Sequence, residues 1–370
     1  MSPADRTPQH WIRPEVQALA AYHVPDSGGL IKLDAMENPY RWPAPLVDAW
    51  LDVLRSVELN RYPDPGAAEL TAALRRNMRV PEAMQVVLGN GSDELIQMLA
   101  LAVAGPQRVI LAPEPTFVMY RMIATFAGMQ YRGVPLAEDF SLDVDAMLDA
   151  IERERPAIVF LAYPNNPTGT LFGRAAVEAV IEAAPGLVVV DEAYAPFTDA
   201  SFMPRLGDYP NLLVLRTVSK MGLAGLRLGL LAGPAEWLGQ IDKVRLPYNI
   251  NVLTQASARF ALEHQAVLDE QTGWIRRDRD QLMAALGGIA GVHAYPSEAN
   301  FVLFRTPAGR ATAVFESLRA QGVLIKNLGA GGGPLGDCLR VTVGTADEND
   351  AFLAALRQAL DNPAAVSTTA

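Results

Sequence analysis

The sequence predicts an α/β protein whose large domain is built on a mostly parallel, seven-stranded sheet flanked by helices. The chain has 370 residues, which is too many for one small core and fits two domains. From about residue 86, short apolar runs alternate with helix-length segments. The runs are continuously apolar, which indicates strands that helices cover on both faces, as in a parallel sheet.

Seven runs are expected to form this sheet, and helix-length segments separate them. In chain order they are VVL at 86–88, RVILA at 108–112, QYRGV at 130–134, AIVFLA at 157–162, LVVV at 187–190, LLVL at 212–215 and RLGLLA at 227–232. A helical stretch at about 251–287 follows the last of them.

The C-terminal part predicts a smaller α+β unit. Its strands are NFVLF, VLIK and CLRVTV, and its helices lie at about 311–320 and 347–361. Residues 1–40 carry turn signals and are expected to pack on this unit, so that both termini build the small domain. We therefore expect residues 41–270 to form the large, ligand-binding domain and residues 271–370 the small C-terminal domain.

Composition argues against several classes of protein. The net charge of -10 disfavours nucleic acids and anionic membrane surfaces as partners. No apolar stretch reaches the ~20 residues of a membrane span, and the polar N-terminus lacks the apolar segment of a signal peptide. Cys338 is the only cysteine, which excludes an intramolecular disulfide and favours a reducing, cytoplasmic location. We expect Cys338 to be a core residue, and we expect no metal site.

The residues that follow each predicted strand are the candidates for a binding site, because ligands of open α/β sheets bind beyond the carboxyl ends of the strands. GNGSDELI follows the first strand, and Ser92 and Asp93 open a helix whose free N–H groups suit a phosphate. An ordinary capped helix start has the same pattern. PEPTFVMY follows the second strand, and its Phe117 is placed either against a flat ring or in the core.

Two further strand ends carry polar side chains. PNNPTGT at 164–170 forms a stiff turn whose amide side chains can face a ligand. In DEAY, Asp191 ends a buried strand, and a carboxylate there needs a partner because unpaired buried charge is costly. A protonated ring nitrogen would be such a partner, and a nearby Arg or Lys is the alternative.

Lys220 directly follows another buried strand, in RTVSKMGLAGLRLG. A lysine amine that is desolvated or close to other cations has a lowered pKa and becomes a nucleophile toward carbonyls. Arg216 and Arg227 flank Lys220 in sequence and are expected to help, and Arg227 also suits a bidentate hold on phosphate. A surface lysine whose stem lies along apolar residues is the alternative.

The chain resembles the fold type I, aspartate-aminotransferase-like family of pyridoxal 5′-phosphate enzymes over essentially its whole length. The motifs that carry this resemblance are, in chain order, GSDE, PTF, NNPTG, DEAY, SK and R. The resemblance implies that Lys220 holds pyridoxal 5′-phosphate as a Schiff base and that Asp191 pairs with its pyridinium nitrogen. It implies further cofactor contacts from Asn166 and Tyr194 to the phenolic oxygen, from Phe117 to the ring face, and from Ser92, Asp93, Ser219 and Arg227 to the phosphate. Six residues separate Lys220 from Arg227, where this family often has seven.

A narrower resemblance is carried by IRPEVQALAAYHVP, LDAMENPY, NRYPDP and LRVTVGTADEN, which are similar to histidinol-phosphate aminotransferases. It implies a homodimer that transfers an amino group between L-histidinol phosphate and 2-oxoglutarate, giving imidazole acetol phosphate and glutamate. Tyr62 is implied to reach the cofactor phosphate of the neighbouring subunit. The implied substrate contacts are Arg340 to the anionic group, Lys326 as a second cation, and Tyr22, Asn166 and Tyr248.

Two other functions remain open from the sequence, and a third is disfavoured. An aminotransferase for aromatic amino acids and a threonine-phosphate decarboxylase share this scaffold. A regulatory ligand-binding protein with the same fold is disfavoured, because the lysine and aspartate set is complete and no DNA-binding extension precedes residue 40.

Overall fold

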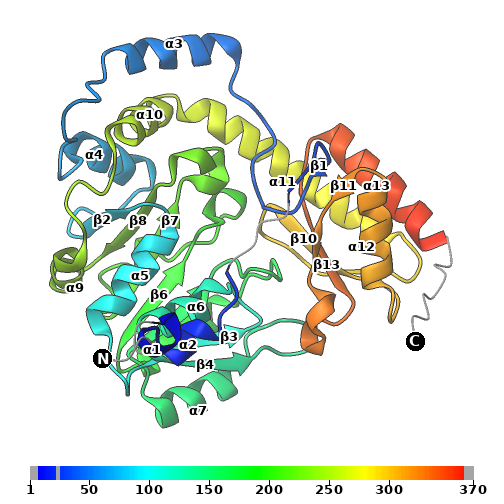
Figure 1. Cartoon of the computed structure of the whole chain (residues 1–370), viewed down its shortest axis with the longest axis horizontal. Helices are drawn as coiled ribbons and strands as arrows, with labels where there is room; N and C mark the ends of the chain where they lie inside the picture. Colours follow the sequence, from blue (N-terminus) through cyan, green and yellow to red (C-terminus); the bar gives the residue numbers. More distant parts are fainter. Residues whose placement is uncertain (1–6, 22–25, 362–370) are drawn as a thin grey trace.

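The computed structural model describes residues 7–21 and 26–361 and confirms the α/β fold class (Figure 1). A seven-stranded sheet has the order β2-β8-β7-β6-β5-β3-β4, and β8 is antiparallel to both of its neighbours while the other pairings are parallel. Its strands are β2 (Gln85–Gly89), β3 (Val109–Glu114), β4 (Gln130–Pro135), β5 (Ile158–Ala162), β6 (Leu187–Asp191), β7 (Leu212–Thr217) and β8 (Gly229–Gly233).

The sheet is covered on both faces, as the continuous apolar runs predict. Along β6, Val188 and Val190 join one buried cluster and Leu187 and Val189 join another, because successive side chains of a strand point to opposite faces. The helices of this part are α3 (Ala44–Arg55), α4 (Ala68–Asn77), α5 (Ser92–Val103), α6 (Met119–Phe126), α7 (Val144–Glu154), α8 (Arg174–Ala183), α9 (Ala235–Ile241) and α10 (Val252–Glu263).

A second, smaller unit contains the predicted C-terminal strands. Its sheet has the order β12-β13-β10-β9 and is antiparallel, and β1 pairs with β11 in a separate parallel ladder. Cys338 is buried here, as expected, and burial raises its pKa to about 11. The elements are β1 (Ile31–Lys32), β9 (His293–Ala294), β10 (Phe301–Arg305), α12 (Ala311–Ala320), β11 (Val323–Leu324), β12 (Lys326–Asn327), β13 (Cys338–Thr342) and α13 (Ala346–Asp361).

The N-terminal segment divides between the two units, so the expectation that all of residues 1–40 packs on the smaller unit is wrong. β1 pairs with β11 of the smaller unit, but α2 (Pro14–Gln17), which follows α1 (Pro8–Trp11), contacts α6 of the large sheet. The reason is that Arg13 donates hydrogen bonds to the carbonyls of Phe126 (2.6 Å) and Thr125 (3.3 Å), which lie at the end of α6 where helix carbonyls lack partners.

The long helix α11 (Gln265–Gly287) joins the large sheet to the smaller unit (Figure 1). It passes without a break through the boundary expected at residue 270, so the domain limits 41–270 and 271–370 stay a proposal. No helix within residues 7–21 and 26–361 is long and apolar enough to cross a membrane.

Candidate active site

A cavity of about 100 Å³ lies at the carboxyl ends of β5, β6 and β7 and at the start of α5. Parallel strands bring their carboxyl ends to one edge of the sheet, so residues far apart in sequence meet there. The cavity gathers the following residues proposed from the sequence: Ser92, Asp93, Phe117, Asn166, Asp191, Tyr194, Ser219, Lys220 and Arg227.

Asp191 ends β6 and is a buried carboxylate, with 4% of its surface exposed. The backbone N–H of Ala193 donates to Oδ1 (3.1 Å) and the Tyr120 hydroxyl donates to Oδ2 (2.7 Å). Burial raises the pKa of Asp191 to about 6, although both hydrogen bonds act in the opposite direction. In the described part of the chain it forms no ion pair with an Arg or Lys, so the carboxylate is suited to a cationic group in the cavity.

Lys220 lies in η4 (Ser219–Met221), directly after β7, and its Nζ is 5.7 Å from the centroid of the Tyr194 ring. Burial lowers the pKa of Lys220 to about 8, and the cations Arg340 and Arg227 lower it further. A larger fraction of this amine is therefore neutral near pH 7 than of an ordinary lysine, as the proposed nucleophile requires.

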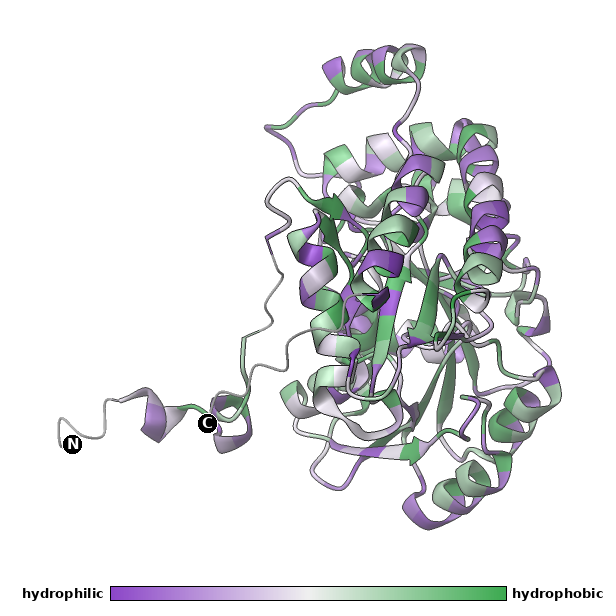
Figure 2. Cartoon of the chain, turned by 90° about the vertical axis from the view of Figure 1, so that its right-hand side faces the viewer, coloured by the Kyte–Doolittle hydropathy of each residue, from purple (hydrophilic) through white to green (hydrophobic). Residues whose placement is uncertain are grey.

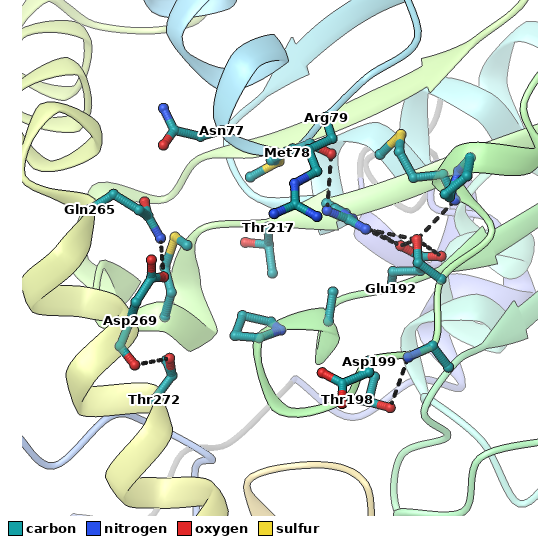
Figure 3. A pocket seen from close by; sticks show the side chains of 18 residues that line it. Asn77, Met78, Arg79, Glu192, Thr198, Asp199, Thr217, Gln265, Asp269 and Thr272 are labelled. Carbon is teal, nitrogen blue, oxygen red and sulfur yellow. Dashed lines mark hydrogen bonds and ion pairs between the residues drawn. The ribbon is translucent and has the colours of Figure 1, made fainter.

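Arg216 does not act on Lys220, contrary to our expectation. Its guanidinium donates to Oε2 of the fully buried Glu192 from Nη2 (2.7 Å) and from Nε (2.9 Å), so its charge is neutralised. The pair lies in a separate cavity of about 530 Å³, shown in Figure 3 with Glu192 and Thr217 on its wall. This larger cavity contains neither Lys220 nor Asp191, so the candidate chemistry belongs to the smaller one.

The lowered pKa of Lys220 predicts how the rate of its reaction with an aldehyde depends on pH. In cofactor-free protein, we expect the rate of covalent capture of pyridoxal 5′-phosphate by Lys220 to rise with pH through a midpoint near 8, because only the neutral amine attacks the carbonyl. Stopped-flow absorbance measures this rate, and the Lys220→Ala variant supplies the background from exposed lysines. A rate that still rises toward the ordinary lysine pKa of ~10.4 would contradict the assignment.

The start of α5 forms a cradle for an anion. Gly91 precedes the helix at φ 82°, a left-handed conformation that favours glycine, and no side chain caps the first N–H groups. A Cβ at Gly91 would lie 2.6 Å from Arg227 Nη2, so the guanidinium lies directly against the helix start. Arg227 Nη2 is 3.2 Å from Asp93 Oδ2. With six residues between it and Lys220, Arg227 still reaches the N-terminus of α5, where a phosphate would bind.

Arg340 adjoins the cavity through Asn166. It donates from Nη1 to Asn166 Oδ1 (2.6 Å) and from Nη2 to the Asp34 carbonyl (3.0 Å), and its guanidinium lies 5.2 Å above the Phe301 ring. Lys326 of β12 is paired directly opposite Arg340 of β13. Directly opposed residues share one face of a sheet, where two like charges are destabilising. An anion bound near both cations would remove this cost.

Two sequence-proposed tyrosines, Tyr62 and Tyr248, lie on the surface of the chain. Tyr62 is 81% exposed and stacks on Tyr248, with ring centroids 4.5 Å apart, and neither residue lines the cavity of its own chain. Tyr22 lies outside the described residues. One buried residue was missed: Tyr120, the hydrogen-bond donor to Asp191. Its signal in the sequence is its position three residues after Phe117, which places both rings on one side of a helical turn.

The donor set fits pyridoxal 5′-phosphate. The buried carboxylate of Asp191 suits a protonated ring nitrogen, the amine of Lys220 suits an aldehyde, and the cradle at Gly91 and Arg227 suits a phosphate. Among the described residues, no group of three or more His, Cys, Asp or Glu side chains could hold a metal ion.

Comparisons with known proteins agree with this chemistry. The family model described as aminotransferase class I and II matches residues 29–356. A histidinol-phosphate aminotransferase 2 of Nitrosococcus oceani is 61% identical, and the match covers 97% of this chain and 99% of the relative. A histidinol-phosphate aminotransferase 2 of Cupriavidus pinatubonensis is 55% identical, and the match covers 95% of this chain and 97% of the relative. The structure of histidinol-phosphate aminotransferase from Sinorhizobium meliloti in complex with pyridoxal-5′-phosphate is similar with a TM-score of 0.84 and 26% identity, over 94% and 97% of the two chains.

Proposed function

Because the chain belongs to the class I and II aminotransferase family, we propose that it transfers an amino group between L-histidinol phosphate and 2-oxoglutarate in histidine biosynthesis. The products are imidazole acetol phosphate and glutamate. The chain is a pyridoxal-phosphate-dependent aminotransferase. The observation that carries the choice of substrate is the 61% identity to a histidinol-phosphate aminotransferase over nearly the full length of both chains.

The residues of the cavity have distinct tasks in this reaction. When bound, the cofactor supplies an aldehyde that receives the amino group and a ring that withdraws electrons from the reacting carbon of the substrate. Lys220 Nζ takes a proton from that carbon and later returns one, as general base and general acid. Asp191 would hold a negative charge for the ring nitrogen, Phe117 would cover the ring, and Asn166 and Tyr194 would orient its oxygen. The phosphate would be held by Ser92, Asp93, Ser219 and Arg227.

Arg340 and Lys326 account for the anionic parts of both substrates. The two substrates differ in length but share one site, so one cation must serve a phosphate in one half-reaction and a carboxylate in the other. Arg340 is held rigidly by Asn166, the Asp34 carbonyl and the Phe301 ring, and its planar guanidinium can bind either anion. Lys326, opposite it, adds a point charge for the phosphate.

We expect Arg340→Ala to damage both half-reactions and Lys326→Ala to raise mainly KM for the phosphorylated amine. A hydrogen bond to a charged group contributes roughly 1.5–3 kcal/mol, so each lost contact should lower kcat/KM by about 10- to 150-fold. Single-turnover kinetics with histidinol phosphate and with glutamate separate the two half-reactions. The exposed Lys243 supplies a control, because Lys243→Ala removes a charge outside the cavity. Equal damage by Lys326→Ala in both halves would refute the division of tasks.

The substrate is tested by comparing amino donors, with 2-oxoglutarate as the acceptor. The rate at which glutamate forms is measured for each donor. Histidinol phosphate is expected to exceed unphosphorylated histidinol and phenylalanine in kcat/KM. If phenylalanine is the better donor, the enzyme is an aromatic aminotransferase instead. If threonine phosphate releases carbon dioxide without 2-oxoglutarate, it is a decarboxylase.

We also propose a homodimer in which Tyr62 completes the site of the neighbouring subunit. α3 lies at the top edge of the chain in both views, where it packs on α10, and none of its residues is buried (Figures 1 and 2). Large apolar side chains are exposed on α3, on α10 and close in sequence to Tyr62 and Tyr248, namely Leu51, Leu253, Leu59 and Leu246. Exposed apolar side chains of this size support association with a second protein surface. The location proposed for this dimer is the cytoplasm, and no nucleic acid is proposed as a partner.

The dimer is expected to have about twice the chain mass of 39.9 kDa in sedimentation at micromolar concentration. Subunit mixing tests the shared site. Tyr62→Ala and Lys220→Ala are each expected to be impaired, but hybrid dimers should recover activity, because one of their two sites has both Lys220 and the neighbour's Tyr62. An active monomer, or mixed subunits without recovery, would refute this arrangement.

A further inference from the structure

Tyr120 forms a buried contact to the carboxylate at the centre of the candidate site. Its side chain is fully buried in α6, and its hydroxyl donates to Asp191 Oδ2 at 2.7 Å. The other carboxylate oxygen accepts only the Ala193 backbone N–H among the hydrogen bonds of the described residues. Tyr120 is therefore the side-chain donor that fixes the rotation of the Asp191 carboxylate.

The same ring also supports the aromatic wall of the cavity. Tyr120 stacks on Phe160 of β5, with centroids 4.5 Å apart and planes at 6°, so its position is fixed by the sheet. The edge of Phe117 meets it at 5.5 Å and 87°. Tyr120 thus contacts both Asp191 and Phe117, the two residues proposed to meet the cofactor ring at its nitrogen and on its face.

We propose that Tyr120 is a positioning residue that holds the Asp191 carboxylate ionised and oriented, and so keeps the shared proton on the ring nitrogen of the cofactor. This inference rests on the role proposed above for Asp191. The hydrogen bond stabilises the charged form of the carboxylate, because a hydroxyl can donate to an ionised oxygen at short distance in a buried site. Without that donor, Asp191 becomes a stronger base and competes with the ring nitrogen for the proton.

The other groups around Asp191 make this donor necessary. Burial and the negative charges of Asp93 and Glu192 raise the pKa of Asp191, whereas Tyr120 and the Ala193 N–H lower it. Tyr194 also lies close enough to interact electrostatically with Asp191, and Lys220 lines the same cavity. Among the side chains of the described residues, the Tyr120 hydroxyl is therefore the hydrogen-bond donor that favours ionised Asp191.

The test is Tyr120→Phe, which removes the hydroxyl and leaves an aromatic ring to stack on Phe160. In cofactor-free protein labelled with ¹³C at the aspartate carboxyl groups, the Asp191 resonance is identified by its absence from Asp191→Asn. Its titration midpoint is expected near pH 6 in the unchanged protein and about one to two pH units higher in Tyr120→Phe. The matched control is Tyr40→Phe, which removes a tyrosine hydroxyl that donates to the buried Asp278 (3.3 Å) outside the cavity. It should leave the Asp191 midpoint unchanged.

A second readout follows the cofactor itself. With pyridoxal 5′-phosphate labelled by ¹⁵N in the ring, the unchanged protein should show a protonated ring nitrogen at neutral pH, and Tyr120→Phe should show a shift toward the neutral nitrogen. A folded Tyr120→Phe protein with an unchanged Asp191 midpoint and an unchanged nitrogen signal would overturn the inference. If the ring nitrogen is neutral in the unchanged protein, the role proposed for Asp191 fails, and with it the proton-holding part of the inference.

Discussion

Replacing Lys220 by alanine is expected to abolish transamination and to leave the fold intact. The side chain is the amine in the cavity that can bond the cofactor and also move the proton at the reacting carbon, so no neighbouring group replaces both functions. The substitution removes a half-buried amine whose pKa is lowered by burial, so it should not reduce stability. Steady-state kinetics and thermal unfolding measure the two effects.

The control for this experiment is Lys243→Ala, which changes an exposed lysine outside the cavity and should retain full activity. Retained turnover in Lys220→Ala would show that another residue carries the chemistry. Loss of activity together with loss of folding would instead identify Lys220 as a structural residue.

Replacing Asp191 by alanine is expected to reduce kcat by about 10²-fold or more, with a much smaller effect on cofactor affinity. The carboxylate stabilises positive charge on the ring nitrogen in the transition state, whereas the phosphate contacts at the start of α5 and at Arg227 remain. Rapid-quench kinetics on cofactor-saturated protein gives the rate, and fluorescence titration gives the affinity.

Asp278→Ala is the matched control, because Asp278 is also a buried aspartate that accepts a hydrogen bond from a tyrosine but lies outside the cavity. It should lower the free energy of unfolding and preserve the activity of each folded molecule. If Asp191→Ala behaves in the same way, Asp191 has only a structural role.

The sequence predicts the sheet well because each strand is determined by a continuous run of apolar residues in its own segment. Each continuous apolar run corresponds to a strand, and the residues after the strands meet because parallel strands share one edge. The helical stretch expected at 251–287 is also found, divided into α10 and α11 at His264.

Contacts between distant segments could not be predicted in this way. α2 lies on α6 because Arg13 reaches carbonyls more than a hundred residues away, and no local pattern carries that information. Arg216 is close to Lys220 in sequence, but its partner Glu192 directly follows the neighbouring strand β6. The contact of Tyr120 with Asp191 likewise depends on how α6 packs against the sheet.

The central claim is that Lys220 bonds the cofactor, and borohydride reduction tests it most directly. Protein loaded with pyridoxal 5′-phosphate is reduced, digested and examined by mass spectrometry. We expect the reduced cofactor on the peptide that contains Lys220, and no stable label in Lys220→Ala. Label on another lysine, or a protein that binds no cofactor, would contradict the account.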